Sequence, residues 1–204
     1  MTFYPNKFIK KTINFYIYNI YMKINTKFVI IVFYILVLLI SKKRYYSLLP
    51  TLPLYPDNKK EADIVKEISD KRTREQVEFA NLIDGGMAVP FSKIIPVDID
   101  EINRVASSTN IIIIILKLLY NRARPKQVNK SINTLKSFSA QTPAYPSGHA
   151  FQAYYLAKVY SKKYPQQKEQ LWRLADKCSL ARVHAGLHYK SDGAYSKYLV
   201  NTYF

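Results

Sequence analysis

The amino-acid sequence predicts an all-α protein: a helical bundle preceded by one hydrophobic segment near the N-terminus. Apolar residues recur at helical spacing through most of residues 61–204, and several of these stretches follow helix-start signals. The β-branched run at 111–115 has the composition of a strand, but the chain offers no second strand-like run to pair with it. A length of 204 residues suffices for one domain with a real core and a short appendage.

Residues 1–44 are expected to form a basic N-terminal segment that contains a membrane anchor. The run from Phe28 to Ile40 is uninterrupted apolar sequence. As a helix it rises only about 20 Å, short of the ~30 Å hydrocarbon core, but residues 24–41 are long enough if Lys27 snorkels. These lengths favour a single-pass anchor in a membrane.

A cleaved secretory signal is the main alternative for this segment, and it would give a secreted or periplasm-like protein. The stretch that precedes the apolar run is longer than in most signal peptides, and no small-residue cleavage pattern follows the run. Lysine and arginine are balanced on its two sides, so the sequence does not predict the orientation of an anchor. A buried helix of a soluble protein is the third interpretation.

Residues 45–60 are expected to be a linker, because Pro50, Pro53 and Pro56 disfavour both a helix and an inner strand. The helical domain is then expected to span residues 61–204.

Helix signals recur along this domain. Thr73 and Gln76 have the spacing of a capping box, which predicts a helix over residues 74–83. Residues 111–120 are interpreted as a helix that continues to Arg122. The other predicted helices cover residues 61–69, 98–107, 147 or 148 to about 161, 166–183, and a short stretch after residue 192.

The charge of the chain indicates an anionic partner. The formal net charge is +17, Asp57 is the only acid in residues 1–60, and no acid lies between Glu101 and Glu169. Phosphorylated substrates, a membrane surface or nucleic acid would each suit this charge. Cys178 is the only cysteine, which excludes an internal disulfide and a cysteine-based metal site.

Lys117 and Arg124 frame the first of three polar motifs, K-L-L-Y-N-R-A-R-P. Seven helical steps return to within about 20° of the same face, so one helix would place both cations on one side. Lys117 follows six aliphatic residues, and its buried ammonium would need an anion unless it snorkels to water. Arg124 precedes Pro125 and is expected at a helix end. A snorkelling lysine and an arginine on the helix dipole are the alternative.

The second motif is Pro146-Ser147-Gly148-His149. Ser147 is a good N-cap, and Gly148 lets a backbone N–H approach an anion closely. The N-terminus of a helix attracts anions, and His149 in its first turn could give a proton to a leaving oxygen. The alternative is an ordinary cap followed by an exposed histidine.

The third motif contains Arg182, His188 and Asp192. Asp192 lies four residues after His188, within reach of its ring. A carboxylate on one ring nitrogen fixes the tautomer and leaves the other nitrogen nucleophilic. Gly186 would permit a break before His188. The alternative is a polar helix end with a structural histidine.

Taken in this order, the three motifs resemble the signature K-x6-RP, PSGH and SR-x5-H-x3-D of the type 2 phosphatidic acid phosphatase and vanadium haloperoxidase superfamily. The resemblance covers residues 117–192 and is nearest to the bacterial nonspecific (class A) acid phosphatases. Ala181 stands where serine is usual, and Lys190 where proline is frequent. The resemblance implies the helical bundle of that superfamily.

The resemblance also implies a role for each residue. His188 would attack phosphorus and become a phosphohistidine, Asp192 would orient it, and His149 would protonate the leaving alkoxide and then activate water. The implied phosphate-binding groups are Lys117, Arg124, Ser147, the Gly148 N–H and Arg182. No metal and no other cofactor is implied, and vanadate is expected to inhibit.

The expected function is therefore that of a phosphomonoesterase acting on a small or lipid phosphate. Residues 111–120 are too short to span a bilayer, so the catalytic part is expected to be a soluble domain held at the membrane by residues 24–41. Nucleic acid is not an expected partner of such an enzyme.

Three alternatives remain open at this point. A vanadate-dependent haloperoxidase would use the same residues, with His188 as the vanadium ligand. A basic, membrane-attached module could bind anionic lipid or nucleic acid without catalysis. A zinc site of His184, His188 and Asp192 on one helix would leave the other two motifs without a purpose.

Overall fold

The structure is a computed structural model that describes residues 28–31, 33–34 and 55–204. The chain divides into two compact units, Met1–Lys43 and Arg44–Phe204. Residues 28–31 and 33–34 of the predicted anchor are helical, and the rest of the anchor and most of the predicted linker lie outside the described residues. In the described part of the second unit every regular element is a helix, which confirms the all-α class.

The helices of this unit follow the order of the predicted ones, with short additions. They are α2 Asn58–Asp70, α3 Arg74–Asp84, α4 Ala88–Ser92, α5 Ile99–Ser107, α6 Asn110–Tyr120, α7 Pro125–Val128, α8 Gly148–Lys163, α9 Lys168–His184 and α10 Lys190–Tyr203, with 3-10 turns η2 Phe138–Gln141 and η3 Pro165–Gln167. The sequence patterns missed α4, α7 and η2, which are too short to show a periodicity.

Local signals explain several helix boundaries. The capping box of α3 is confirmed, because Thr73 Oγ1 accepts a hydrogen bond from Gln76 N and Gln76 Oε1 accepts one from Thr73 N. Asp57 caps α2 by accepting from Lys60 N at 2.9 Å. The last helix, α10, is longer than predicted, since it begins at Lys190 and runs almost to the end of the chain.

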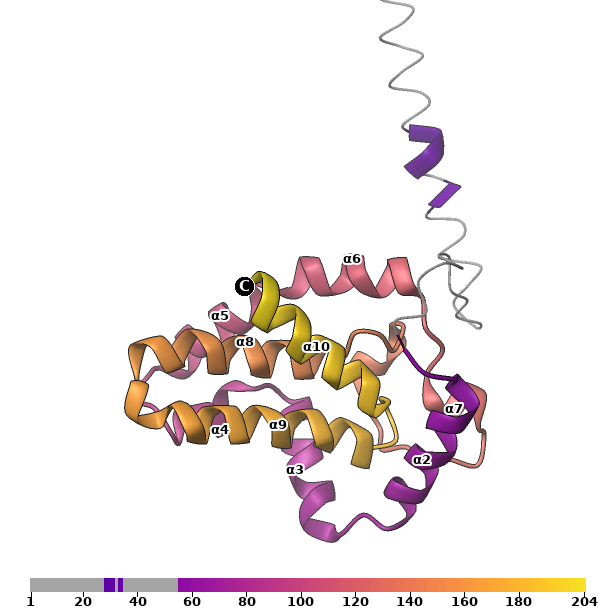
Figure 1. The fold of residues 1–204 in the computed structure, drawn as a ribbon, viewed down its shortest axis with the longest axis horizontal. Coiled ribbons are helices and arrows are strands. Elements are labelled where there is room, and N and C mark those ends of the chain that lie inside the picture. The colour runs from indigo at the N-terminus through magenta and orange to yellow at the C-terminus, as the bar shows by residue number, and fades with distance from the viewer. Residues whose placement is uncertain (1–27, 32, 35–54) are drawn as a thin grey trace, which may run out of the picture. The chain divides into compact units, whose positions relative to one another are not determined.

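The centre of the bundle is an antiparallel hairpin in which η3 joins α8 to α9. Helix α10 crosses this hairpin (Figure 1). Small side chains let these helices approach one another closely. Buried alanines lie on both arms of the hairpin: Ala150, Ala153, Ala157, Ala175 and Ala181. The thiol of Cys178 is buried in the same layer, and α3, α4 and α5 pack on the hairpin to complete the main apolar core.

The segment between Lys117 and Arg124 differs from the prediction. Helix α6 ends at Tyr120, and Asn121 adopts a left-handed conformation with φ of 45°. Arg122 therefore lies outside the helix, and Arg124 is the residue before the short helix α7. The prediction that one helix places both cations on one face is wrong. Asparagine tolerates the left-handed region better than most residues, which makes it a suitable helix terminator.

One stretch of the described chain, Ile99–Val128, is apolar and long enough to pass as a membrane span by length and composition. Its mean hydropathy reaches 1.5 in the best window, of which 28% is buried. The backbone does not run through it as one helix, because α5 ends at Ser107 and α6 ends at Tyr120. Core helices of soluble proteins have the same composition.

Gly193 of α10 faces Ser179 of α9 at a helix crossing. A Cβ placed on Gly193 would lie 2.0 Å from Ser179 Oγ and 3.4 Å from Ser179 Cβ. We therefore expect Gly193→Ala to lower the free energy of unfolding by about 1–2 kcal/mol through overpacking, although alanine favours a helix. In a Ser179→Ala background the same change should cost much less, as measured by urea unfolding. Equal losses in the two backgrounds would contradict this account.

Candidate active site

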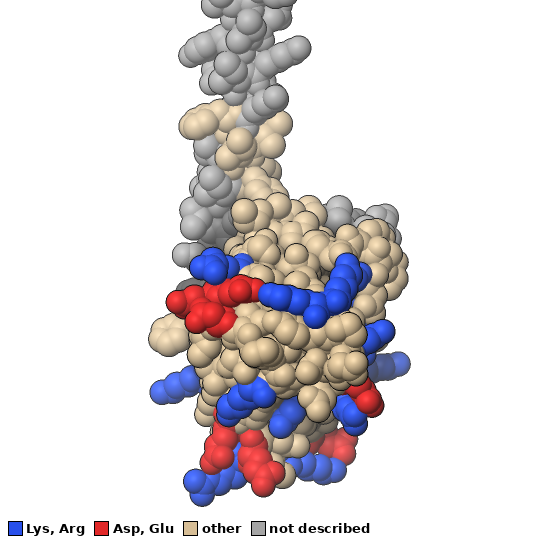
Figure 2. All heavy atoms as spheres, turned by 90° about the vertical axis from the view of Figure 1, so that its left-hand side faces the viewer, with Lys and Arg blue, Asp and Glu red and all other residues tan. Residues whose placement is uncertain are grey.

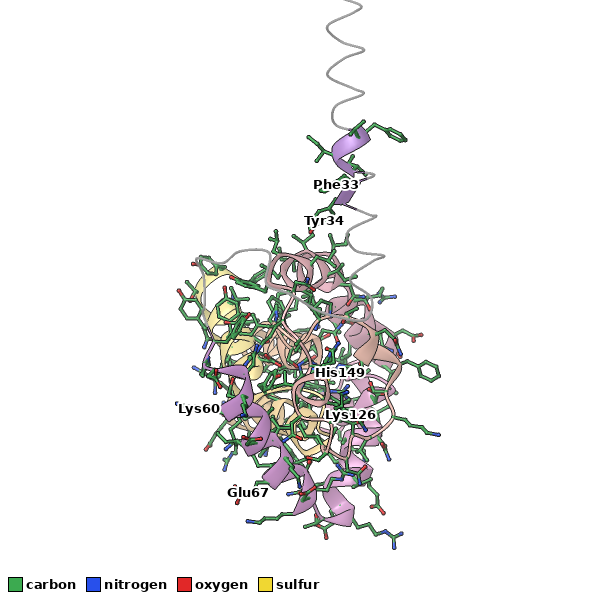
Figure 3. The ribbon with its side chains drawn as sticks, turned by 90° about the vertical axis from the view of Figure 1, so that its right-hand side faces the viewer. Phe33, Tyr34, Lys60, Glu67, Lys126 and His149 are labelled. Carbon is green, nitrogen blue, oxygen red and sulfur yellow. The ribbon has the colours of Figure 1, made fainter. Side chains whose placement is uncertain are left out.

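Four helix ends meet at one end of the bundle. The C-termini of α6 and α9 lie there together with the N-termini of α8 and α10 (Figure 1). Figure 3 looks onto this end, and His149, in the first turn of α8, lies near its middle. The unpaired N–H groups at the start of α8 make this a favourable place for an anion.

A cavity of about 200 Å³ lies between these helix ends. Its volume equals that of several water molecules, enough for an anion of the size of phosphate. The predicted residues on its wall are Lys117, Arg124, Gly148, His149 and His188. Ser139 and Thr142 add hydroxyl groups, and Ile113 and Ile114 of α6 form an apolar side. The structure thus brings residues from all three sequence motifs to one place.

The ring of His188 has a defined tautomer. Its Nδ1 lies 2.9 Å from Asp192 Oδ2, and its Nε2 lies 2.9 Å from Arg124 Nη1. A guanidinium only donates hydrogen bonds, so Nε2 must be the accepting nitrogen and Nδ1 must carry the proton. Nε2 therefore holds the lone pair of the ring, which accepts from Arg124 in this structure and becomes available as a nucleophile only when that hydrogen bond is released.

The pKa values of this pair reflect their burial. Burial, reinforced by the charges of Arg124 and Lys117, holds the pKa of His188 well below its ordinary value. Burial raises the pKa of Asp192 to about 6, against the opposing effect of Arg122. At neutral pH the arrangement is then a neutral imidazole beside an ionised carboxylate.

Two cations, Lys117 and Arg124, line the cavity, Arg182 lies behind Ser139 of its wall, and all three are buried. Lys117 Nζ donates to Pro143 O at 2.6 Å, and Arg124 donates to Thr142 O at 2.8 Å and to Leu187 O at 2.9 Å. Carbonyl oxygens satisfy these donors but do not neutralise their charge. Burial and the nearby charge of Arg124 accordingly hold the pKa of Lys117 well below its ordinary value. A bound anion would relieve this electrostatic cost.

Arg182, the third cation, is held by groups that a substrate could replace. Its Nη1 donates to Asp84 Oδ1 at 2.9 Å, and its Nη2 donates to Ser137 Oγ and Ser139 Oγ at 3.1 and 3.2 Å. Within the described part of the chain, Nε of this 1% exposed residue has no hydrogen-bond partner. A buried unpaired donor is costly, so Arg182 has the capacity to bind a further oxygen.

His149 lines the cavity and lies near the carboxylate that binds this arginine. Its Nε2 lies 3.9 Å from Asp84 Oδ1. Burial and the charge of Arg182 lower the pKa of His149 to about 3, and Asp84 opposes the shift. In the unliganded structure the ring is therefore neutral at physiological pH.

The two residues before His149 shape the start of α8. Ser147 is buried, and its Oγ accepts from Ala150 N at 3.4 Å, as an N-cap does. Gly148 brings the helix start close to Lys117, since a Cβ there would lie 3.7 Å from Lys117 Cε. Ser147 N also donates to Asp192 O at 3.3 Å, which joins the second and third motifs through the backbone.

The single helix that a zinc site would need does not form. Helix α9 ends at His184, Gly186 turns the chain with φ of 73°, and α10 begins only at Lys190. A Cβ on Gly186 would lie 2.9 Å from Ile132, so glycine is needed at this turn. The described residues contain no cluster of three or more potential metal ligands.

Sequence reasoning missed several residues that adjoin the site. Asp84 and Arg122 carry charges that contact the predicted residues, and Ser137, Ser139 and Thr142 supply polar groups from the loop around η2. Arg122 lies inside the K-x6-RP motif, and its charge was the only signal available. Nothing in the sequence connects Asp84 with residues almost a hundred positions away.

Comparison with known proteins places these residues in a family. The sequence model of the PAP2 superfamily matches residues 104–199, which contain all three motifs. This match confirms the resemblance to the superfamily that the sequence motifs indicated. A search of curated protein sequences gives no match to the chain.

A solved structure shares the fold. It is described as the first transmembrane PAP2-type phosphatidylglycerolphosphate phosphatase from Bacillus subtilis, and it matches with a TM-score of 0.50 and 19% sequence identity. The match covers 83% of this chain and 89% of the other. At this identity the likeness concerns the fold. Together with the superfamily match, it supports a phosphatase at the level of the family.

The buried charge of Lys117 leads to a prediction about ligand binding. Inorganic phosphate should raise the thermal unfolding midpoint of the wild type, by the equivalent of about 2.7 kcal/mol at a hundred times its Kd. Lys117→Met removes a desolvated ammonium that Arg124 and Arg182 repel, so we expect a midpoint at least as high as that of the unliganded wild type.

The same variant should lose most of its response to phosphate. Differential scanning fluorimetry over a phosphate series measures both effects, with chloride at matched ionic strength as the control. A strong phosphate response in Lys117→Met would show that the anion binds elsewhere.

Proposed function

We propose that the protein is a phosphatase that hydrolyses phosphate monoesters through a covalent phosphohistidine. The observation that carries the proposal is the arrangement of His188: Asp192 holds Nδ1, and Nε2, which accepts from Arg124, lies beside a cavity lined by Lys117 and Arg124. When Arg124 transfers its hydrogen bond from Nε2 to a phosphate oxygen, in-line attack by this nitrogen would form an N–P bond and break the bond from phosphorus to the ester oxygen.

Lys117, Arg124, Arg182 and the N-terminus of α8 are the proposed ligands of the non-bridging oxygens. Charge that develops on these oxygens in the transition state would meet fixed positive groups. The proposal needs no metal ion, because these groups supply the positive charge.

His149 is the proposed acid for the leaving group. The pKa of the unliganded ring is lowered to about 3, in part by Arg182. A phosphate dianion bound between them would counteract that positive charge, so substrate binding itself favours the protonated ring. After the alcohol leaves, the neutral ring would accept a proton from the water that attacks phosphohistidine, releasing phosphate and restoring His188.

The central prediction concerns His188. His188→Ala should reduce kcat by at least about a thousandfold, because the nucleophile is lost. Rapid acid or detergent quenching during turnover of a ³²P-labelled ester should leave label on the wild-type chain, in an acid-labile and alkali-stable form. His184→Ala is the matched control, since that half-buried histidine lies in another hollow, lined by Phe79 and Lys177, and should keep wild-type turnover.

Three outcomes would contradict the proposal. Chelator-sensitive hydrolysis would indicate a metal enzyme. Peroxide-dependent bromide oxidation in the presence of vanadate, without phosphate release, would indicate a haloperoxidase. Phosphate binding without turnover of any ester would leave a non-catalytic anion-binding module.

The outer face of α6 favours a substrate at a membrane surface. Ile111, Ile114, Ile115 and Leu119 follow one another at helical spacing and are 40–75% exposed. On the side drawn in Figure 2, the described atoms at the top of the domain, where α6 lies in Figure 1, include no Lys, Arg, Asp or Glu. Exposed apolar surface of this kind marks an interaction site, and α6 also lines the cavity.

We therefore propose that the domain acts on lipid phosphates, at a membrane to which residues 24–41 anchor it. A larger hollow of about 460 Å³, lined by Asp84, Lys136 and Phe138, adjoins the site through Asp84 and could take part of the leaving group. Small soluble phosphates, as used by the acid phosphatases that the motifs resemble, would then be slower substrates.

The α6 face provides the test of this substrate class. In Ile111→Ser/Ile115→Ser, kcat/KM for a long-chain phosphatidic acid in mixed micelles should fall about tenfold or more, because apolar surface that would contact the lipid is lost. The rate with p-nitrophenyl phosphate should stay within about twofold. Equal losses with both substrates would point to a structural role for this face.

A further inference from the structure

Arg122 is a second arginine within K-x6-RP, and it is more completely buried than Arg124. It lies in the loop between α6 and α7, and its side chain has no exposed surface. An arginine is rarely buried to this extent unless its charge is compensated and its donors are satisfied. Both conditions are met here, and both involve Asp192.

The guanidinium donates hydrogen bonds in three directions. Nη1 donates to Asp192 Oδ1 and to Ser191 Oγ, both at 2.7 Å. Nη2 donates to Glu61 Oε2 at 2.7 Å, and Nε donates to Asn58 Oδ1 at 2.9 Å. Two carboxylates therefore share one guanidinium, and two of its partners come from the first turn of α2.

Aromatic rings fix the plane of this group. The Arg122 Cζ lies 4.1 Å from the centre of the Tyr55 ring and 3.8 Å from that of Tyr189. Such contacts favour a planar guanidinium over an ammonium. The fork of Arg122 can thus neither rotate nor withdraw without disturbing the segment from Tyr55 to Glu61.

Asp192 is oriented from both sides. Oδ1 accepts from Arg122, whereas Oδ2 accepts from Tyr189 N at 3.0 Å and faces His188 Nδ1 at 2.9 Å. A carboxylate held by one oxygen alone could turn about its side-chain bonds. With both oxygens held, the direction of the His188 ring and its tautomer are fixed as well.

We propose that Arg122 is a positioning residue of the phosphatase reaction, which fixes the Asp192 carboxylate behind His188 and is itself held by Glu61 of α2. The inference rests on the proposed function for its kinetic part. Glu61 of α2 contacts Arg122, Arg122 contacts Asp192, and Asp192 contacts the proposed nucleophile His188. These contacts extend the site to the start of the helical domain.

The effect of Arg122 on the ionisation of Asp192 supports the same role. Asp192 must stay ionised to stabilise the positive ring that forms when His188 bonds to phosphorus. Burial raises the pKa of Asp192, and Arg122 is the first group that opposes the rise. Removal of Arg122 should therefore raise this pKa further, and the carboxylate would be protonated over part of the working pH range.

The first test compares steady-state kinetics of the full chain carrying Arg122→Lys, with p-nitrophenyl phosphate as substrate. Lysine keeps the charge but loses the fork, so kcat should fall about 10- to 100-fold, the range found for outer partners of metal-binding histidines. KM and the inhibition constant of phosphate should change less than about threefold, since Arg122 does not contact the substrate. Arg122→Met should lose more and should shift the acid limb of the kcat–pH profile to higher pH.

Two variants show whether the effect passes through Asp192. In an Asp192→Asn background, Arg122→Lys should cause little further loss of kcat, because the two side chains act as one unit. The matched control is Arg72→Met, which removes an arginine that donates to the backbone carbonyls of Asn133 and His184 instead. This control should keep wild-type kcat and the wild-type pH profile.

A spectroscopic measurement tests the geometry without catalysis. The Nδ1 proton of His188, hydrogen-bonded to a buried carboxylate, should give a far-downfield ¹H resonance that His188→Gln removes. In Arg122→Lys the resonance should move upfield or broaden. An unchanged resonance together with unchanged kcat would overturn the proposal, and so would a rise in KM alone, which would make Arg122 a substrate ligand.

Glu61→Gln decides the question if both Arg122 variants fail to fold. This variant keeps an oxygen acceptor for Arg122 but removes the negative charge. We therefore expect kcat and the resonance to change in the same direction as in Arg122→Lys, by a smaller amount. Wild-type values for both would overturn the proposal. A wild-type protein that hydrolyses no phosphate ester would overturn the proposed function, and the resonance would still report whether Arg122 orients His188.

Discussion

The burial of three cations at one end of the bundle, two of them on the wall of a small cavity, is the constraint on which the arrangement of the site depends. Lys117, Arg124 and Arg182 are each at most 6% exposed, and their partners are mainly carbonyl and hydroxyl oxygens. Such a group of charges would be unstable in an apolar core. It is tolerated at the end of the bundle because helix termini supply oriented backbone groups and because an anion can enter.

The negative charges are distributed unevenly about His188. Asp192 and Glu61 lie behind the ring around Arg122, whereas Asp84 is the acid on the side of Arg182 and His149. A phosphoryl group in the cavity would therefore lie between cations in front of it and a ring backed by carboxylates. In this structure Asp84 compensates part of the positive charge on the front side, so a phosphate bound at Arg182 would compete with this carboxylate. This competition would disfavour weakly charged ligands.

The sequence alone predicts those features that depend on interactions between neighbouring residues. Thr73 and Gln76 predict the start of α3 because their hydrogen bonds lie within one turn. The i, i+4 spacing of His188 and Asp192 also predicted their contact. Their actual geometry is that of a loop histidine bonded to a residue in the first turn of α10, a detail that spacing does not contain.

Features that depend on distant segments could not be predicted in this way. The left-handed turn at Asn121 changes how Lys117 and Arg124 meet, and a helical wheel cannot represent it. Arg122 finds Glu61 across 61 positions and Asp192 across 70. Only the folded chain shows that Arg122, in the middle of the first motif, does not line the cavity and binds Asp192 and Glu61 instead.

The single thiol of the chain has a practical consequence. Cys178 lies at the centre of α9 with no exposed surface, and burial raises its pKa to about 12. The thiolate that reacts with alkylating reagents is therefore nearly absent from the native state. Labelling of this one sulfur would report how often the α8–α9 hairpin separates from its neighbours, which provides a reporter of global opening that requires no engineered probe.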